Sequence, residues 1–386
     1  MSKIRNLNTR QLIKLASPVI CLGILLLITE QTLAQVKWWN PAKNSFPVIE
    51  NQPWGNEVGA FYDRFPARAE PLVRKEVWNL SKNGAGLKLR FNTDAKSVVV
   101  RYVVEKKSYA MNHFPATGVS GVDLYSLNND KTWAWANGRS VFGDTITYTF
   151  SSLDLNTEDY KNGREYHLYM PLYNNVVWME VGVPEKSSFN PLPLTKEKPI
   201  VVYGTSISQG GCASRPGMAW PAIVERDLHI PVVNLSFSGN GRLEKEVIDL
   251  INEIDAKMFV LDCLPNLGAS SDQELETKLI ESVTALRQKH PKVPILLTGH
   301  SGFIQNRMNS SIRKSVTNQN KVNTDAYNKL IASGMKDLYI LPGHKVDMGT
   351  DGTVDGSHPT DFGMYKYAKA YEEILSSIFK DKKKRN

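Results

Sequence analysis

A short run of apolar, β-forming residues, 200–203, ends at Gly204 and is followed two positions later by Ser206. Runs of this length between proline and glycine are typical of buried strands in a parallel sheet. Open sheets of that kind place their ligands at the carboxyl ends of their strands, so Ser206 is expected at such an edge. A serine there is as often a turn residue or a helix cap, so a catalytic reading needs support from elsewhere in the chain.

That support comes from a loop near the other end of the chain. Asp355 and His358 lie three residues apart, directly before a predicted helix, and this spacing lets one short loop present both side chains to one point. Together with Ser206 they would supply a nucleophile, a base and an acid that orients the base. Asp347 and Asp351 are nearby alternatives for the acid, and Asp355 is preferred because it shares a compact loop with His358.

The chain from residue 199 onward alternates between predicted strands and predicted helices. The strands are 200–203, 232–236, 258–262, 294–298 and 338–341, and the helices are 219–229, 242–253, 272–289, 323–335 and 361–379. This βαβ series predicts a parallel sheet with helices on both faces, a three-layer α/β/α domain.

Residues 62–183 show a different pattern, made of short strands separated by glycine, asparagine and aspartate. The clearest strands are 87–91, 98–104, 145–150, 165–170 and 176–181, and no helical periodicity is predicted between them. This pattern predicts an all-β, jelly-roll-like sandwich. Residues 184–198 are rich in proline and polar residues and are expected to form a linker.

The first 34 residues have the features of a secretory signal peptide. Basic residues precede an apolar stretch, 16–28, and Thr32-Leu-Ala34 is a small-residue cleavage signal. We expect cleavage after Ala34 and a secreted or periplasmic bacterial protein; an uncleaved anchor is the alternative, although the apolar stretch is short for one. The chain then divides into a β domain (35–183), a linker (184–198), an α/β domain (199–379) and a basic, disordered tail (380–386).

Charge and cysteine content restrict the partners. The formal net charge is +8, but much of it lies in residues 1–34 and 380–386, so the body is near neutral and nucleic acid is not expected as its main partner. No histidine or cysteine cluster has zinc spacing, and no cofactor is expected. Cys212 and Cys263 would remain after processing, and the sequence leaves open whether they form a disulfide or stay as free thiols.

Four ordered blocks resemble those of SGNH/GDSL hydrolases: Gly204-Thr-Ser-Ile, Phe237-Ser-Gly-Asn-Gly, Asp262-Cys-Leu-Pro-Asn and Asp355-Gly-Ser-His-Pro. The motif Gly121-Val-Asp-Leu-Tyr further resembles a two-domain bacterial branch with an N-terminal β domain. The resemblance implies a flavodoxin-like catalytic domain. It also implies an oxyanion hole made by the N–H groups of Ser206 and Gly239 and the side chain of Asn266, with Asn240 as a rival for the amide.

Two positions depart from the wider family pattern. Thr205 stands where an aspartate usually precedes the serine, and the aspartate that usually follows the block-three asparagine is missing after Asn266. Asp123, in the Gly121 motif, has two possible roles: a turn acid that fixes local backbone, or part of a loop that leans on the catalytic domain and forms part of the substrate cleft.

The resemblance implies a secreted serine esterase that works through an acyl-Ser206 intermediate. The two-domain proteins it resembles are commonly carbohydrate esterases, so an acetylated polysaccharide or oligosaccharide is the expected substrate. No stable membrane insertion is expected after signal cleavage. The alternatives are a lipase or thioesterase acting on longer acyl chains and, in a different class, a non-catalytic glycan-binding protein.

Overall fold

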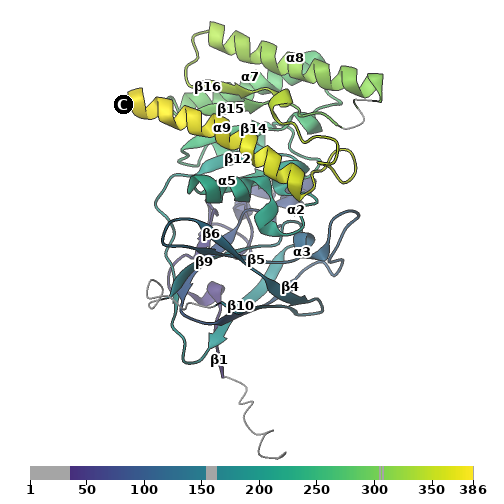
Figure 1. Ribbon diagram of the computed structural model, residues 1–386. Coiled ribbons are helices and arrows are strands. Elements are labelled where there is room, and N and C mark those ends of the chain that lie inside the picture. The colour runs from purple at the N-terminus through teal and green to yellow at the C-terminus, as the bar shows by residue number, and fades with distance from the viewer. Residues whose placement is uncertain (1–34, 154–162, 304–305, 307, 386) are drawn as a thin grey trace, which may run out of the picture.

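The computed structural model describes residues 35–153, 163–303, 306 and 308–385. The predicted signal peptide and its cleavage site lie outside these residues. Within them the chain forms a β-sandwich and an α/β domain, which pack against each other end to end (Figure 1). In the described part of the chain, no helix combines the length and the apolar character that crossing a membrane requires.

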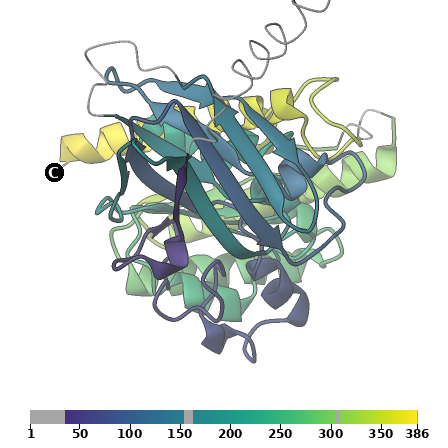
Figure 2. The same ribbon diagram turned by 90° about the horizontal axis from the view of Figure 1, so that it is seen from below.

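The N-terminal part is a sandwich of two antiparallel sheets (Figure 2), as predicted. Strand β4 (Ser97–Val104) shows why it forms, because its residues alternate between buried and half-buried positions along the whole strand. The first sheet has the order β1 (Val36–Trp39), β10 (Val176–Pro184), β4, β8 (Ile146–Ser151), β7 (Gly138–Val141). The second has the order β11 (Phe189–Pro191), β3 (Lys88–Thr93), β9 (Arg164–Tyr169), β5 (Asp123–Leu127), β6 (Trp133–Ala136), and β2 (Ile49–Glu50) pairs with β3.

The second part contains a five-stranded parallel sheet. Its order is β13 (Val232–Ser236), β12 (Ile200–Gly204), β14 (Met258–Asp262), β15 (Ile295–Thr298), β16 (Leu338–Leu341). In chain order this is 2-1-3-4-5, the flavodoxin-like arrangement, whose ligand crevice lies where the winding direction reverses, between β12 and β14. Ser206 follows β12, and Asn266 follows β14.

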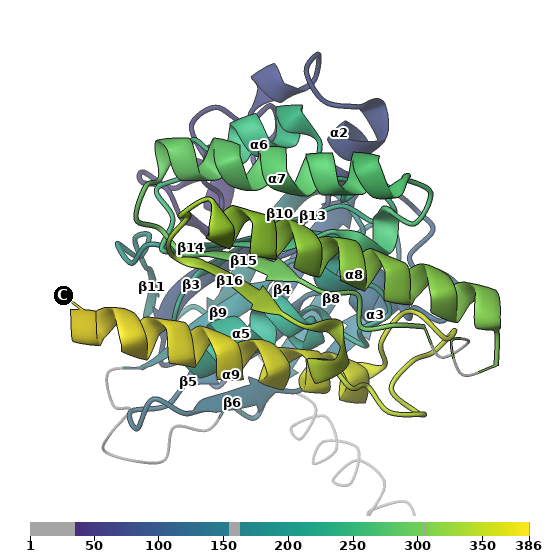
Figure 3. The same ribbon diagram turned by 90° about the horizontal axis from the view of Figure 1, so that it is seen from above.

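Helices cover both faces of this sheet (Figure 3), which confirms the three-layer prediction. Side chains of β12 alternate between two cores: Val201 and Tyr203 join one, and Ile200 and Val202 join the other. The first core is shared with α6 (Lys245–Ile251), α7 (Asp272–Lys289) and α8 (Ser310–Ala332). The second is shared with α5 (Trp220–Leu228) and α9 (Asp361–Arg385).

The N-terminal part differs from the expectation of an all-β domain, because it contains α2 (Lys75–Ser81) and the short α3 (Ala116–Val119). Val77 and Trp78 of α2, with Trp54 and Phe65 before it, are buried in the core of the α/β domain, on the side of α6 and α7. A seven-residue helix is too short for its apolar period to stand out, and its partners lie far along the chain. Trp54, Phe65, Val77 and Trp78 therefore complete the hydrolase core rather than the sandwich.

Three other segments differ from their predictions. Residues 184–198, expected to be a linker, contain β11, which pairs with β3 and so belongs to the sandwich. The basic tail is not a separate disordered end, since α9 continues to Arg385. Helix α8 begins at Ser310 instead of 323, because its first half is mostly polar and shows little apolar periodicity.

Candidate active site

The turn after β12 fixes the position of Ser206. Thr205 caps the short helix α4 (Ser206–Gln209), and its backbone N–H donates to Ser208 Oγ over 2.9 Å. A Cβ added to Gly204 would lie 2.1 Å from Ser208 Oγ, so only glycine fits at the end of the strand. Ser206 is 9% exposed at the carboxyl edge of the sheet, as its place after the strand predicts.

The structure brings the three predicted triad residues together in a continuous chain of hydrogen bonds. Ser206 Oγ lies 2.8 Å from His358 Nε2, and His358 Nδ1 lies 2.7 Å from Asp355 Oδ2. With Nδ1–H donating to the carboxylate, Nε2 is left to accept the serine proton. Asp347 instead accepts from the N–H of Gly349, and it has no contact with the histidine among the described residues.

Asp355 is held as a carboxylate by the loop that carries it. Its partial burial alone would raise its pKa, but hydrogen bonds from the N–H and ring of His358 and from the N–H of Ser357 outweigh this and lower it. Asp355 Oδ1 accepts from these two N–H groups at 2.7 and 2.9 Å. The acid therefore stays charged and keeps the imidazole oriented.

The groups expected to form an oxyanion hole surround the same edge. The N–H of Ser206 is at the first position of α4, where no intrahelical acceptor exists. Gly239 has φ of +69°, a conformation that favours glycine, and a Cβ placed on it would meet nothing within 4 Å, so it faces open space. Asn266 Oδ1 accepts from the N–H of Gly241 over 3.1 Å, which leaves Nδ2 as the side chain's donor.

Asn240, the rival for the amide role, is engaged elsewhere. Its Nδ2 donates to the carbonyl of Ser238 over 2.7 Å, and its Oδ1 accepts from Arg74 over 2.8 Å. Arg74 also pairs with Glu244, so an arginine from the N-terminal part braces this loop. The geometry thus favours Asn266 over Asn240.

Two further residues support the site, and no pattern in the sequence pointed to them. The buried side chain of Gln209 donates to the carbonyl of Leu172 over 3.2 Å and accepts from the N–H of Ser238, beside Gly239, over 2.8 Å. The hydroxyl of Tyr173 donates to the carbonyl of Ser206 over 3.1 Å. Tyr173 and Leu172 precede β10 of the sandwich, so the N-terminal part contacts the nucleophile's own backbone.

For Asp123, the structure supports the alternative in which its loop leans on the catalytic domain. Its Oδ2 accepts from Arg215 Nη1 over 2.6 Å and from the N–H of Gly217 over 3.0 Å, and its Oδ1 accepts from the indole of Trp135 over 2.7 Å. The guanidinium of Arg215 lies 4.3 Å from the ring centroid of Trp135. Burial raises the pKa of Asp123, and the ion pair with Arg215 opposes that rise. We call this group the Asp123–Arg215 clamp.

The loop that the clamp holds also contacts the histidine's side of the site. Ser214 donates from its N–H and its hydroxyl to Asp361, over 2.8 and 2.5 Å, and its carbonyl accepts from Thr117 of α3. Asp361 is the first residue of α9 and follows His358 by three positions. Contacts therefore run from the sandwich, through residues 214–217, to the start of α9, three residues after the base His358.

Cys212 and Cys263 are free thiols, so the structure takes the second of the two alternatives left open by the sequence. Cys263 is buried and its Sγ lies 3.4 Å from the carbonyl of Tyr203. Burial, with a contribution from Asp355, raises the pKa of Cys212 to about 11, so its thiol stays protonated at neutral pH. The described residues contain no group of three histidine, cysteine or acidic side chains arranged to hold a metal ion.

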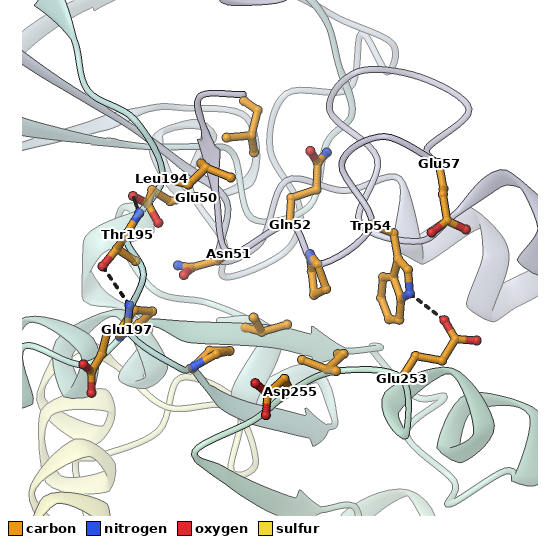
Figure 4. Close-up of a pocket in the computed structure, with 16 residues that line it drawn as sticks. Glu50, Asn51, Gln52, Trp54, Glu57, Leu194, Thr195, Glu197, Glu253 and Asp255 are labelled. Atoms are coloured by element: carbon orange, nitrogen blue, oxygen red, sulfur yellow. Dashed lines mark hydrogen bonds between the residues drawn. The ribbon is translucent and has the colours of Figure 1, made fainter. Parts of the chain in front are cut away.

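A cavity of about 440 Å³ lies at the other edge of the sheet (Figure 4). It is lined by residues that precede the parallel strands, such as Pro199 and Pro231, and by residues between 49 and 57 of the N-terminal part. Its acidic side chains have partners: Glu253, for example, accepts from Trp54 Nε1 and pairs with Arg68. None of the triad residues lines it, so it is separate from the chemistry.

Comparison with known proteins shows which family the chain belongs to. The family model of the GDSL-like lipase/acylhydrolase family matches residues 197–376, and the model of the N-terminus of Esterase_SGNH_hydro-type proteins, termed GxDLY, matches 36–189. A protein from Bacteroides ovatus ATCC 8483, described as a GDSL-like lipase, is 30% identical, with a TM-score of 0.80 over 90% of this chain and 98% of that one. The chain belongs to the GDSL-like lipase/acylhydrolase family.

More distant structures share the fold of this GDSL-like hydrolase. The salicylyl-acyltransferase SsfX3 of a tetracycline biosynthetic pathway is 17% identical, with a TM-score of 0.68 over 89% of this chain and 97% of that one. An acetyl xylan esterase, Est2A, from Butyrivibrio proteoclasticus is 11% identical, with a TM-score of 0.52 over 88% and 98%. A search of curated proteins found no match.

Proposed function

We propose that this GDSL-like hydrolase is a serine esterase that removes acetyl or other short acyl groups from a polysaccharide or oligosaccharide. The observation that carries the proposal is the hydrogen-bonded chain from Ser206 Oγ through His358 to Asp355. A serine hydroxyl is a weak nucleophile until a base accepts its proton, and this chain supplies that base together with the group that orients it.

The first half of the reaction transfers the acyl group to the protein. His358 Nε2 takes the proton of Ser206 as Oγ bonds to the ester carbonyl carbon. The carbonyl oxygen becomes an oxyanion, which accepts hydrogen bonds from the N–H groups of Ser206 and Gly239 and from Asn266 Nδ2. When the bond to the alcohol oxygen breaks, the proton on Nε2 passes to that oxygen, and the free alcohol leaves.

The second half uses one water molecule and the same groups. His358 takes a proton from the water, whose oxygen attacks the acyl carbon, and the same donors stabilise the second oxyanion. The bond to Ser206 Oγ then breaks, Oγ recovers its proton from Nε2, and the carboxylic acid is released. Asp355 remains a carboxylate throughout and stabilises the imidazolium that forms in each half.

The sugar ester as substrate is supported by analogy of fold. One protein of similar fold is the acetyl xylan esterase described above. Another is a family-two carbohydrate esterase from Clostridium thermocellum, which is 14% identical, with a TM-score of 0.50 over 76% of this chain and 92% of that one. We also propose that the protein is secreted or periplasmic, on the basis of the signal-like pattern in residues 1–34.

The test is acetate release from a panel of acetylated polysaccharides, with 4-nitrophenyl acetate and 4-nitrophenyl octanoate measured in parallel. We expect acetate from at least one glycan and preference for acetate over octanoate, with both lost in Ser206→Ala and retained in Ser377→Ala, an exposed serine on α9. Cleavage of octanoate without glycan activity would identify a lipase or thioesterase. Binding of glycans without cleavage of any ester would identify a binding protein.

A further inference from the structure

A depression of about 340 Å³ adjoins the candidate active site on two sides. One wall is formed by Pro265 and Gly268, which flank Asn266 on the loop after β14. Another is formed by Asp355 and Ser357, which belong to the loop of His358. The volume is near the lower end of the range for small-ligand pockets, about 300–1,000 Å³, and is larger than an acetyl group requires.

The remaining wall comes from residue 303 and the first half of α8, and it is largely apolar. Phe303, Ile312 and Val316 line it. The ring of Phe303 packs edge-to-face on His300, with centroids 4.6 Å apart and an interplanar angle of 82°. His300 is itself buried, so the phenyl ring is held in a defined orientation. An apolar wall of this kind suits the C–H face of a sugar ring.

One side-chain oxygen on this wall lacks a hydrogen-bond donor among the described residues. Gln319 is 7% exposed; its Nε2 lies 3.4 Å from Ser315 Oγ, and its Oε1 has no partner among the described residues. The amide lies beneath the Asn266 loop, because a Cβ on Gly268 would be 3.5 Å from Gln319 Nε2. A buried acceptor without a donor is unfavourable, so a ligand hydroxyl that donates to Gln319 Oε1 would remove that cost.

The position of the depression indicates which half of an ester it would hold. His358 must pass a proton to the departing alcohol oxygen, so the alcohol half has to lie beside the His358 loop. That loop walls the depression. Neither Gly239 nor Asn266, which would bind the carbonyl oxygen, lines it, although Pro265 and Gly268 beside Asn266 do.

We propose that this depression is the subsite for the alcohol half of the ester and holds one sugar ring. A C–H face of the ring packs on Phe303, and one ring hydroxyl donates a hydrogen bond to Gln319 Oε1. The proposal rests on the esterase function proposed above and adds to it the residues that select the alcohol.

The test compares two alcohols that carry the same acyl group. The substrates are acetylated xylo-oligosaccharides and 4-nitrophenyl acetate, and the measured quantity is the ratio of their kcat/KM values in the full chain. Gln319→Met keeps the length of the side chain and removes the acceptor. It should lower the ratio about ten-fold, chiefly through a higher KM for the oligosaccharide. Ile312→Trp, which fills the depression, should lower it further. Gln288→Met, an exposed glutamine on α7, is the matched control.

Each result decides between distinct conclusions. An unchanged ratio in both depression variants would overturn the subsite and leave the esterase function standing. A changed preference between 4-nitrophenyl acetate and butyrate, with the ratio unchanged, would make the depression an acyl site and overturn the proposal. Cleavage of the aryl ester alone by the wild type would exclude a sugar as occupant. Absence of any Ser206-dependent cleavage would refute the esterase function itself.

Discussion

Replacing Asp123 with Asn should destabilise the folded protein by about 3 kcal/mol, because it breaks the Asp123–Arg215 clamp. The new amide keeps an acceptor for Trp135 but turns an NH₂ group toward Arg215 Nη1 and the N–H of Gly217, which are both donors. Two charge-assisted hydrogen bonds to the carboxylate, each worth about 1.5–3 kcal/mol before solvent compensation, are lost. Arg215 is 23% exposed, so water offsets part of the loss for its charge.

A double-mutant cycle separates the pair from other effects of each substitution. Asp123→Asn, Arg215→Gln and the double variant give the coupling free energy between the two side chains. We expect at least about 1.5 kcal/mol, because Asp123 is only 3% exposed. Lys245 and Asp249 form a matched control pair on the surface of α6, at 80% and 53% exposure, where a much smaller coupling free energy is expected because water screens both charges.

The assay is urea unfolding followed by far-ultraviolet circular dichroism and by tryptophan fluorescence. Both probes should report one transition in the wild type, since residues of the N-terminal part lie in the hydrolase core. A coupling energy for Asp123 and Arg215 no larger than that of the surface pair would refute the reasoning. A lower kcat in Asp123→Asn, at temperatures where the variant stays folded, would show that the clamp also positions the loop that carries His358.

Three further predictions concern the site and its surroundings. Asn266→Ala should lower kcat on 4-nitrophenyl acetate about 10²- to 10³-fold through loss of an oxyanion donor, whereas Asn240→Ala should cost far less; equal losses would contradict the assignment. Asp355→Asn should lower kcat by several orders of magnitude, and an effect under about ten-fold would point to another orienting acid. Burial lowers the pKa of His300 to about 4, so protonation favours the unfolded chain and stability falls as pH drops below about 6.5. Relative to His300→Asn, the wild type should lose about 2 kcal/mol between pH 7.5 and 5.0, measured by urea unfolding; parallel pH dependences would contradict this.

Local pattern predicted the elements whose partners are close in the chain or whose apolar period is strong. The strict alternation in β4 and the apolar run of β12 are examples, and Asp355 and His358 were identifiable because one short loop carries both. Helix α2 was missed because it is short and its apolar side packs on another domain.

Contacts between distant segments were not predictable from one sequence. Tyr173 reaches Ser206 across 33 positions, and Asp123 reaches Arg215 across 92. Gln319 lies in the polar half of α8, which showed no helical period, so its burial beside the site left no trace in the pattern. Such positions depend on how the two parts pack, which residue types and spacing alone do not specify.

The burial of Trp54, Phe65 and Val77 in the hydrolase core constrains how such a protein can evolve. A binding module joined only by a tether can be gained, lost or exchanged by recombination without unfolding its neighbour. Here a crossover near residue 197, where the family model of the hydrolase begins, would remove large side chains from the core and expose the apolar surface beneath them. The β-sandwich and the hydrolase are therefore expected to be inherited as one unit, and a fragment starting at residue 197 should be insoluble or unfolded when expressed alone.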